Sequence, residues 1–266
     1  MQKIFILFFC LIFIIMSNIE VAYTGQALDK ILKNGVLRVG VDAGYIPFVM
    51  KDKKGELIGF DIDFSKLMSK NLGVELKVVN IPWDIIIDEL MADQCDIVMA
   101  GITTTLERNL KVNFTDPYIV AGQTALVNKK LEGSINDFRD LNSVNYIITT
   151  KSGVTALDAV TNFLPRAKIK IFDNEITAIM DVVEGRADAF IYDSPFNIVL
   201  YPRYRDKLFL LDKPFTYEPL SIALNQGDPD FLNWLNNFIR IVKGDGTFEA
   251  LYNKWFVVAR WWENVE

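Results

Sequence analysis

The stretch Met99-Ala100-Gly101-Ile102-Thr103-Thr104-Thr105-Leu106-Glu107-Arg108 follows the buried-strand pattern Cys95-Asp96-Ile97-Val98-Met99 and runs on to Phe114-Thr115-Asp116-Pro117-Tyr118. It offers small residues, hydroxyls and one arginine within a short loop. An arginine fork matches a carboxylate with two hydrogen bonds, and a glycine lets backbone amides approach the same group. The stretch therefore indicates a site for a small carboxylate ligand. The alternative is a strand-to-helix turn with a threonine cap, followed by a solvated Glu-Arg pair.

The composition excludes several classes of function. The chain has 266 residues, of which 51% are hydrophobic and 23% charged, which suits one large domain or two small ones. Its net charge is -6 and no run of basic residues forms a stripe, so nucleic acid is not an expected partner. There is no histidine, so hydrolase triads with a histidine base and most catalytic zinc sites are not expected. We expect neither a metal nor a cofactor.

The N-terminus predicts export from the cytoplasm. Residues 4–16 are almost entirely Ile, Leu and Phe and follow Lys3. This run is shorter than the roughly 20 residues that a membrane span needs, and polar residues follow it. We therefore predict a signal peptide over residues 1–24 and an extracytoplasmic, for example periplasmic, mature protein. An uncleaved membrane anchor is the alternative, because the cleavage site is weakly marked. Cys10 lies in this run and Cys95 in a predicted buried strand, so no disulfide is expected.

From Gly35 onward, short β-rich runs alternate with amphipathic helical stretches, which is typical of an α/β protein. The first series predicts strands over 36–41, 75–79 and 96–100, with helices over 61–71, ended by Gly73, and over 83–92. The second series predicts strands over 146–149, 168–172 and 187–192, with helices over 156–163 and 175–184. Two successive series of similar size indicate two lobes.

The C-terminal part predicts a β run over 219–225, a helix over 230–242 and an aromatic helix over 248–256. These elements are too few for a third domain, so we expect them to complete the first lobe. The chain then crosses between the lobes twice, near 118–126 and 215–221, and two such crossings form a hinge beside a ligand cleft. The predicted division is residues 28–120 plus 219–258 for lobe 1, 124–214 for lobe 2, and 259–266 for a C-terminal tail.

Five segments lie where a strand ends and a helix begins, which is where open α/β sheets bind their ligands. The segment after the first strand offers Tyr45 as a floor for a ligand side chain, with Asp42 beside it; Phe48 is expected in the core. The second segment opens a helix with Trp83, whose indole either covers a ligand or is buried in the core.

The third segment is the glycine-threonine loop, in which Arg108 would pair with a carboxylate. The backbone at Gly101 and Thr103 and the Thr103 hydroxyl would hydrogen-bond other ligand groups. Glu107 is expected to be solvated or to lie on the hinge side.

The remaining two segments belong to the second lobe. Free amides at a helix N-terminus attract anions, Thr155 is suited to complete such a nest, and Lys151 adds a donor at the cleft edge. The alternative is a helix cap beside a surface lysine. Asp193 is expected to face Arg108 across the cleft and would bind an ammonium group. The alternative role for Asp193 is an Asx turn before Pro195. A carboxylate clamp on one lobe and an ammonium clamp on the other specify a zwitterion.

Together these segments resemble the polar amino-acid family of bacterial extracytoplasmic solute-binding proteins, which feed ABC importers. The likeness covers roughly residues 28–256. It rests on Val39 to Asp42 with Pro47-Phe48, Gly59-Phe60-Asp61-Ile62-Asp63, Ala100 to Thr103 with Glu107-Arg108, Phe114 to Tyr118, Lys151-Ser152-Gly153, Tyr192-Asp193, and Gly244 to Thr247 with Lys254-Trp255-Phe256.

The resemblance implies a two-lobed periplasmic-binding-protein fold, the Venus flytrap, that closes on one free L-amino acid. It implies a monomer that delivers this ligand to the permease subunits of an ABC importer. By this likeness, Arg108 with the amides of Thr103 and Thr155 holds the ligand carboxylate. The ammonium group is held by Asp193 and by the carbonyl at Gly101.

The resemblance also implies how the ligand side chain is recognised. Tyr45 and Trp83 would sandwich it, while Asp42 and Lys151 would tune the polarity around it. Lys151 together with Ala100 and Gly101 is more similar to members that take glutamine than to those that take arginine, lysine or histidine, so glutamine or another polar amino acid is the expected ligand. Tyr192 departs from some glutamine-type members.

Two other functions compete with this prediction. Some proteins of this fold resemble cyclohexadienyl or arogenate dehydratases, in which an acidic residue of the cleft acts as a general acid. Asp42 and Asp193 are better explained as ligand clamps, and the five segments offer no third isolated carboxylate, so we expect no catalytic residue. A detached sensor domain is the other alternative. It would need a separate membrane partner, because no apolar span follows Trp262.

Overall fold

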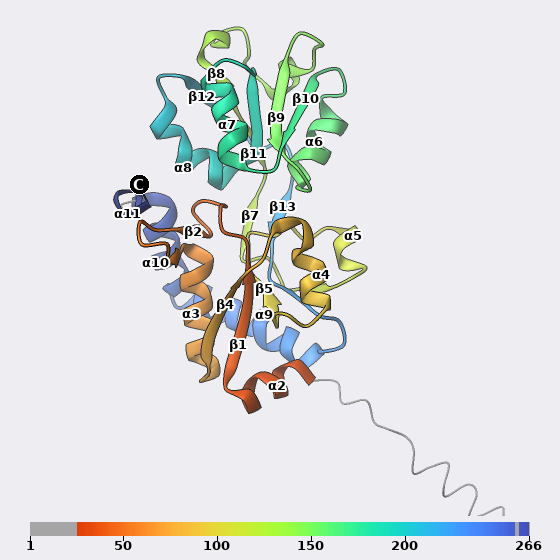
Figure 1. The fold of residues 1–266 in the computed structure, drawn as a ribbon, viewed down its shortest axis with the longest axis vertical. Helices are drawn as coiled ribbons and strands as arrows, with labels where there is room; N and C mark the ends of the chain where they lie inside the picture. The colour runs from red at the N-terminus through yellow and green to blue at the C-terminus, as the bar shows by residue number, and fades with distance from the viewer. Residues whose placement is uncertain (1–25, 259–260, 266) are drawn as a thin grey trace, which may run out of the picture.

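The computed structural model describes residues 26–258 and 261–265, so the predicted signal peptide and Cys10 lie outside the described residues. Two lobes lie one above the other along the long axis of the molecule (Figure 1). Each lobe contains its own five-stranded sheet, which confirms the predicted two-lobed α/β architecture. Within the described ranges, no helix has the length and apolar character needed to cross a membrane.

The sheet of lobe 1 has β1 near its centre, flanked by parallel strands. The pairing of β1 with β4 runs in register from Val36 beside Glu75 to Val41 beside Asn80. The C-terminal strand β14 pairs antiparallel with β5 and β6, which returns the chain to this sheet. In sheet order the strands are β4 (Glu75–Asn80), β1 (Val36–Val41), β5 (Ile97–Val98), β14 (Ala223–Leu224) and β6 (Asn113–Phe114).

The helices of lobe 1 surround this sheet, and α3 and α4 both contact β1. Helix α3 ends where Gly73 adopts the left-handed conformation, as the sequence predicts. The helical elements are α2 (Gln26–Asn34), α3 (Phe60–Leu72), a 3₁₀ turn (Trp83–Ile85), α4 (Ile86–Met91), α5 (Leu106–Asn109), α9 (Pro229–Gly244), α10 (Thr247–Tyr252) and a π-helical turn (Asn253–Val258). The short helix α11 (Trp262–Val265) follows them in the predicted C-terminal tail. A short hairpin joins β2 (Met50–Lys51) to β3 (Leu57–Ile58).

Three predicted elements of lobe 1 differ from the structure. The single β run predicted over 219–225 is two strands, because Ser221 N donates to Ile102 O and Ile222 N donates to the Thr115 hydroxyl between them. The helix predicted over 83–92 starts as a 3₁₀ turn after Pro82. The helix predicted over 248–256 widens into the π-helical turn, which places the Trp255 indole nitrogen 3.0 Å from the Asp63 carboxylate.

The sheet of lobe 2 has the order β10 (Lys168–Phe172), β9 (Ile147–Lys151), β11 (Ala189–Asp193), β8 (Gln123–Asn128) and β12 (Leu208–Leu211). In this sheet, β9, β10, β11 and β12 run in one direction and β8 runs in the opposite direction. The helical elements are two 3₁₀ turns (Lys129–Leu131 and Phe138–Leu141), α6 (Thr155–Phe163), α7 (Glu175–Val183) and α8 (Ser194–Tyr204). The strands β8 and β12 and the helix α8 were not predicted.

The two lobes are joined by β7 (Ile119–Ala121) and β13 (Glu218–Leu220), which pair antiparallel between the sheets (Figure 1). Immediately after β7, Gly122 passes so close to the second crossing that a Cβ there would lie 2.5 Å from Thr216 O. Two strands that cross side by side form the predicted hinge.

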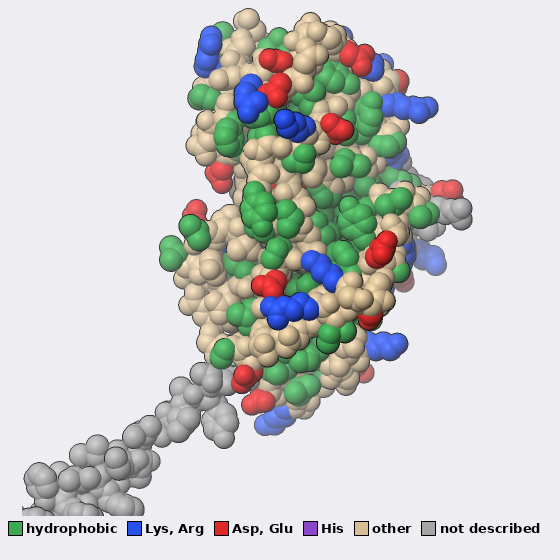
Figure 2. All heavy atoms as spheres, turned by 180° about the vertical axis from the view of Figure 1, so that it is seen from behind, with side chains coloured by type: hydrophobic (Ala, Val, Ile, Leu, Met, Phe, Trp, Pro, Cys, Tyr) green, Lys and Arg blue, Asp and Glu red, His purple; other side chains and the backbone are tan. Residues whose placement is uncertain are grey.

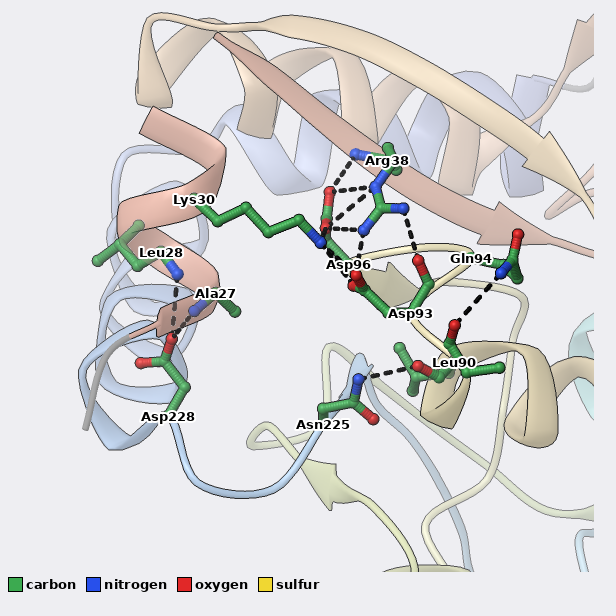
Figure 3. Close-up of polar contacts among 11 residues, drawn as sticks. Ala27, Leu28, Lys30, Arg38, Leu90, Asp93, Gln94, Asp96, Asn225 and Asp228 are labelled. Carbon is green, nitrogen blue, oxygen red and sulfur yellow. Dashed lines mark hydrogen bonds and ion pairs between the residues drawn. The ribbon is translucent and has the colours of Figure 1, made fainter. Parts of the chain in front are cut away.

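Helix α2 is fixed to the end of lobe 1 that lies away from lobe 2 (Figures 1 and 3). The Asp228 carboxylate accepts hydrogen bonds from the amides of Ala27 and Leu28, at 2.8 and 3.0 Å. Lys30 reaches Asp93, and Arg38 of β1 pairs with Asp96 at 2.6 Å and with Asp93 at 2.8 Å. On the face that Figure 2 shows, acidic and basic side chains are interspersed.

Candidate functional site

A small cavity of about 20 Å³ lies where the two lobes meet. All ten residues predicted for the ligand site line it, namely Asp42, Tyr45, Trp83, Ala100, Gly101, Thr103, Arg108, Lys151, Thr155 and Asp193. Val154, Glu175 and Tyr192 line it as well and were not among the predicted site residues.

Arg108 lies on the short helix α5 and extends its guanidinium into the region between the lobes. Nη1 donates to Thr103 O at 2.9 Å, and Nη2 donates to Gly153 O of lobe 2 at 3.4 Å. The guanidinium carbon lies 5.3 Å from the centre of the Trp83 ring. Burial lowers the pKa of Arg108, with nearby carboxylates, Glu218 foremost, opposing the shift. An arginine remains cationic in such a setting.

Each of the two interpretations of the glycine-threonine loop holds for a different residue of the loop. The Thr105 side chain accepts a hydrogen bond from Arg108 N at 3.1 Å, so it caps α5 as the simpler interpretation predicts. Glu107 is exposed, as expected. Arg108, in contrast, is directed to the cavity and is not part of a solvated pair.

Asp193 ends β11 and is almost fully buried in the cavity wall. The Tyr45 hydroxyl of lobe 1 donates to its Oδ2, and Gln123 Nε2 donates to its Oδ1 at 2.6 Å. Its side chain makes no capping bond to α8, so the alternative of an Asx turn does not apply. Burial raises the pKa of Asp193 to about 7, and the hydrogen bond from Tyr45 opposes this shift.

Tyr45 packs directly on the backbone of Gly101. Gly101 has a φ of +58°, and a Cβ at this position would lie 2.2 Å from Tyr45 Cε1. The Tyr45 ring also lies 4.6 Å from the ring of Phe48, and 5.6 Å from that of Tyr192 in lobe 2. Phe48 is completely buried, as predicted for a core residue. Only glycine allows this close approach, which fixes the ring at the contact between the lobes.

A second buried acid holds the Gly101 peptide from within lobe 1. Asp61, which has no exposed surface, accepts a hydrogen bond from Gly101 N at 2.9 Å and one from the Tyr118 hydroxyl at 3.3 Å. Burial raises the pKa of Asp61 to about 7. Tyr118 directly precedes the hinge strand β7, so Asp61 joins the cavity wall to the hinge.

A buried charge cluster forms another part of the cavity. Lys151 Nζ donates to Asp42 Oδ2 at 3.0 Å across the lobes and to Glu175 Oε1 at 2.9 Å. The Tyr192 hydroxyl donates to the same oxygen of Glu175 at 2.9 Å. Burial lowers the pKa of Lys151, but the two carboxylates outweigh this and raise it overall. Burial also raises the pKa of Asp42, with Lys151 opposing the shift.

The positions of these residues correct two expectations. Lys151 is buried, with 5% of its surface exposed, and is not a donor at the cleft edge or a surface lysine. Glu175 supplies the third carboxylate that the five segments did not offer, although its bonds to Lys151 and Tyr192 mean that it is not isolated. Glu175 opens α7 after strand β10, so the strand-to-helix rule would have found it.

Trp83 and the start of α6 complete the cavity. The Trp83 indole nitrogen donates to Gly153 O of lobe 2 at 2.9 Å, and the ring lies 5.6 Å from Lys151 Nζ. The ring is half-buried at the cavity and is not a core residue. Thr155 is the first residue of α6, where backbone amides have no partner within the helix. In the described part of the chain, no group of three or more Cys, Asp or Glu side chains is placed to hold a metal ion.

The cavity between two hinged lobes, with a cation from one lobe and a carboxylate from the other, defines a solute-binding protein. The chain belongs to family 3 of the bacterial extracellular solute-binding proteins, whose model matches residues 37–258. This membership confirms the resemblance inferred from the sequence.

Individual relatives include binding proteins and an enzyme. The chain is 30% identical to the L-cystine-binding protein TcyJ of Escherichia coli over 86% of this chain and 85% of the relative. It is 26% identical to the cyclohexadienyl dehydratase of Pseudomonas aeruginosa, again over 86% and 85%. A solved structure of a putative binding component of an ABC transporter from Wolinella succinogenes, complexed with lysine, is 46% identical with a TM-score of 0.85. The match covers 86% of this chain and 99% of that one.

Proposed function

We propose that this protein captures one free L-amino acid outside the cytoplasm, as a monomer, and delivers it to the permease subunits of an ABC importer. One observation carries this proposal: Arg108 from lobe 1 and Asp193 from lobe 2 line the same small cavity. Opposite charges on separate lobes match the two poles of a zwitterion. A ligand that contacts both lobes stabilises the closed form, so binding and closure are coupled.

The two poles of the ligand have distinct partners in this proposal. The carboxylate lies against Arg108 and the backbone amides of Thr103 and Thr155. The ammonium group lies against Asp193 and the carbonyl of Gly101. The placement of Thr155 at the start of α6 supports the first assignment, because amides at a helix N-terminus favour an anion. The buried carboxylate of Asp193, oriented by two donors, supports the second.

The side chain of the ligand would extend between Tyr45 and Trp83 toward the charge cluster. Two carboxylates, Asp42 and Glu175, face one ammonium group, Lys151, which leaves a net charge of -1. This charge favours a side chain that donates hydrogen bonds and disfavours an acidic one. We therefore propose L-lysine as the first candidate, which the lysine-bound relative supports. L-glutamine, favoured by the sequence, is the second.

The location and the division of the chain are proposals of the same kind. Residues 1–24 would be a signal peptide, or an uncleaved anchor, that leads the protein out of the cytoplasm. Lobe 1 would comprise residues 28–120 and 219–258, lobe 2 residues 124–214, and the C-terminal tail residues 259–266. The extracellular designation of the family supports the location.

A thermal-shift screen of the twenty L-amino acids, followed by titration calorimetry, tests the proposed function. A ligand that binds only the folded protein raises its melting temperature. We expect a rise with L-lysine or L-glutamine and none with L-aspartate or L-glutamate. The D-enantiomer of the best ligand is the matched control, because it presents the same side chain with misplaced poles. Failure of all twenty L-amino acids to bind would refute the proposal.

A dehydratase on the same fold is the second candidate. The dehydratase relative and the third carboxylate, Glu175, favour it. The bonds of Glu175 to Lys151 and Tyr192 weigh against it, because its Oε1 already accepts two hydrogen bonds within the protein. Incubation with prephenate or arogenate and detection of the product separates the two functions.

A further inference from the structure

Gln123 lies at the junction between the hinge and lobe 2. It is the first residue of β8, and one residue, Gly122, separates it from the hinge strand β7. Both its backbone N–H and its backbone carbonyl form hydrogen bonds with the segment that leads into the second crossing. Gln123 N donates to the Thr216 hydroxyl at 2.9 Å, and Gln123 O accepts from Phe215 N at 3.0 Å. The backbone of Gln123 is therefore held by both crossings.

The side chain of Gln123 serves two residues of the proposed ligand site. It has no exposed surface. Its Nε2 donates to Asp193 Oδ1 at 2.6 Å and to the Thr155 hydroxyl at 3.4 Å. Asp193 is assigned to the ammonium pole of the ligand and Thr155 to the carboxylate pole, so one amide group contacts a residue from each pole.

The other end of the amide has no structural partner. Gln123 Oε1 is buried and makes no hydrogen bond within the described structure. A buried acceptor without a partner is unfavourable. In the described part of the chain, the hydrogen bonds of this side chain go to the two site residues.

We infer that Gln123 is a positioning residue of the amino-acid site, which holds the Asp193 carboxylate and the Thr155 hydroxyl in place from the hinge. This inference rests on the proposed function. It has a measurable consequence, because the hydrogen bond from Gln123 opposes the rise that burial causes in the pKa of Asp193. Without this bond, a higher pH is needed to ionise Asp193, and the ammonium group of the ligand loses its partner near neutral pH.

The test uses Gln123→Met, which keeps the length of the side chain, and Gln123→Asn, which keeps the amide but shortens the reach by one methylene group. The matched control is Asn128→Leu. Asn128 is buried at the other end of β8, and its Nδ2 donates to Val182 O at 2.7 Å, away from the cavity. Calorimetric titration with L-lysine, and with L-glutamine in parallel, is carried out from pH 6 to 8.5 after thermal unfolding shows that each variant is folded.

We expect both Gln123 variants to bind roughly ten- to a hundredfold more weakly at pH 7, the loss typical of one hydrogen bond to a charged group. The deficit should shrink toward pH 8.5 as Asp193 ionises. Asn128→Leu should lose thermal stability and keep the wild-type affinity and pH profile, since a purely structural change would not move the profile.

Arg108→Ala is measured in the same series to separate two kinds of failure. If wild type binds, Arg108→Ala does not, and a folded Gln123 variant keeps the wild-type affinity and pH profile, the inference is wrong while the proposed function stands. If wild type binds no amino acid, the proposed function fails and the inference fails with it.

Discussion

Replacement of Gly101 by alanine tests whether close packing of Tyr45 on the cavity wall controls the site. At a φ of +58°, a residue with a Cβ costs roughly 1–2 kcal/mol relative to glycine. The new Cβ would lie 2.2 Å from Tyr45 Cε1, whereas ordinary contacts begin at 3.4 Å, so the ring must move by about 1.2 Å, the difference between these two distances. Such overpacking costs a further ~1–3 kcal/mol.

The displaced ring also affects the contact between the lobes. The Tyr45 hydroxyl donates to Asp193, so a shift of the ring by more than an ångström breaks this hydrogen bond. We expect Gly101→Ala to lower the free energy of unfolding by about 2–5 kcal/mol. We also expect it to weaken ligand binding, because Tyr45 and its hydrogen-bond partner Asp193 both line the cavity.

Gly35→Ala is the matched control. Gly35 has a similar φ of +67°, but no atom lies within 4 Å of the position of its Cβ. It should therefore show only the backbone cost, about 1–2 kcal/mol, with ligand affinity unchanged. Urea unfolding gives the two stabilities, and calorimetry with L-lysine gives the affinities. Equal losses of stability in the two variants, with unchanged affinity in both, would refute the role of the Tyr45 contact.

Three further predictions concern charged residues. Arg108→Ala should weaken amino-acid binding by about 2–5 kcal/mol, and Arg108→Lys by less, because lysine keeps the charge but lacks the fork; unchanged calorimetric affinity in both variants would contradict this. Asp61 has a pKa of about 7 in the folded protein against an ordinary value of 3.8, so its contribution to stability is fully present below about pH 4 and is lost as the pH rises through 7. The free energy of unfolding of Asp61→Asn, measured in urea, should therefore fall less than that of wild type between pH 5 and pH 7.5. An equal fall in the two proteins would argue against this role of Asp61. Lys151→Met leaves Asp42 and Glu175 without their shared cation, so the ratio of L-lysine to L-glutamine affinity should rise about tenfold, and a constant ratio would be the contrary result.

Local patterns were sufficient to predict the elements with strong periodicity or clear end signals. β1 has the predicted bounds, and α3 ends at Gly73 as expected. Helix α8 could not be predicted in this way, because Pro202 interrupts its interior and proline disfavours a helix on local grounds. Every residue of β8 is buried, so the strand shows no alternation of polar and apolar positions. Its antiparallel partners, β11 and β12, are distant in the sequence.

The residues around the cavity could also be predicted from local patterns, because they lie at the ends of strands. The ends of strands mark ligand sites in open α/β sheets, and Asp42, Lys151 and Asp193 all lie at or directly after such ends. Their roles toward a ligand stay predictions until binding is measured. The bond between Tyr45 and Asp193 joins residues 148 positions apart, and the clash that forbids a side chain at Gly101 depends on the same approach of Tyr45. Sequence patterns contain no such distances, so the partners within the site had to come from the structure.

The attachment of α2 determines where a mechanical load would enter the protein. The amides of Ala27 and Leu28 are bonded to Asp228, and Lys30 is paired with Asp93, at the end of lobe 1 remote from the hinge (Figures 1 and 3). Tension applied to the chain ahead of Gln26 is therefore borne within lobe 1, and it does not pass through β7 or β13. A hold on the N-terminal side of the protein would therefore leave the two hinge strands without load.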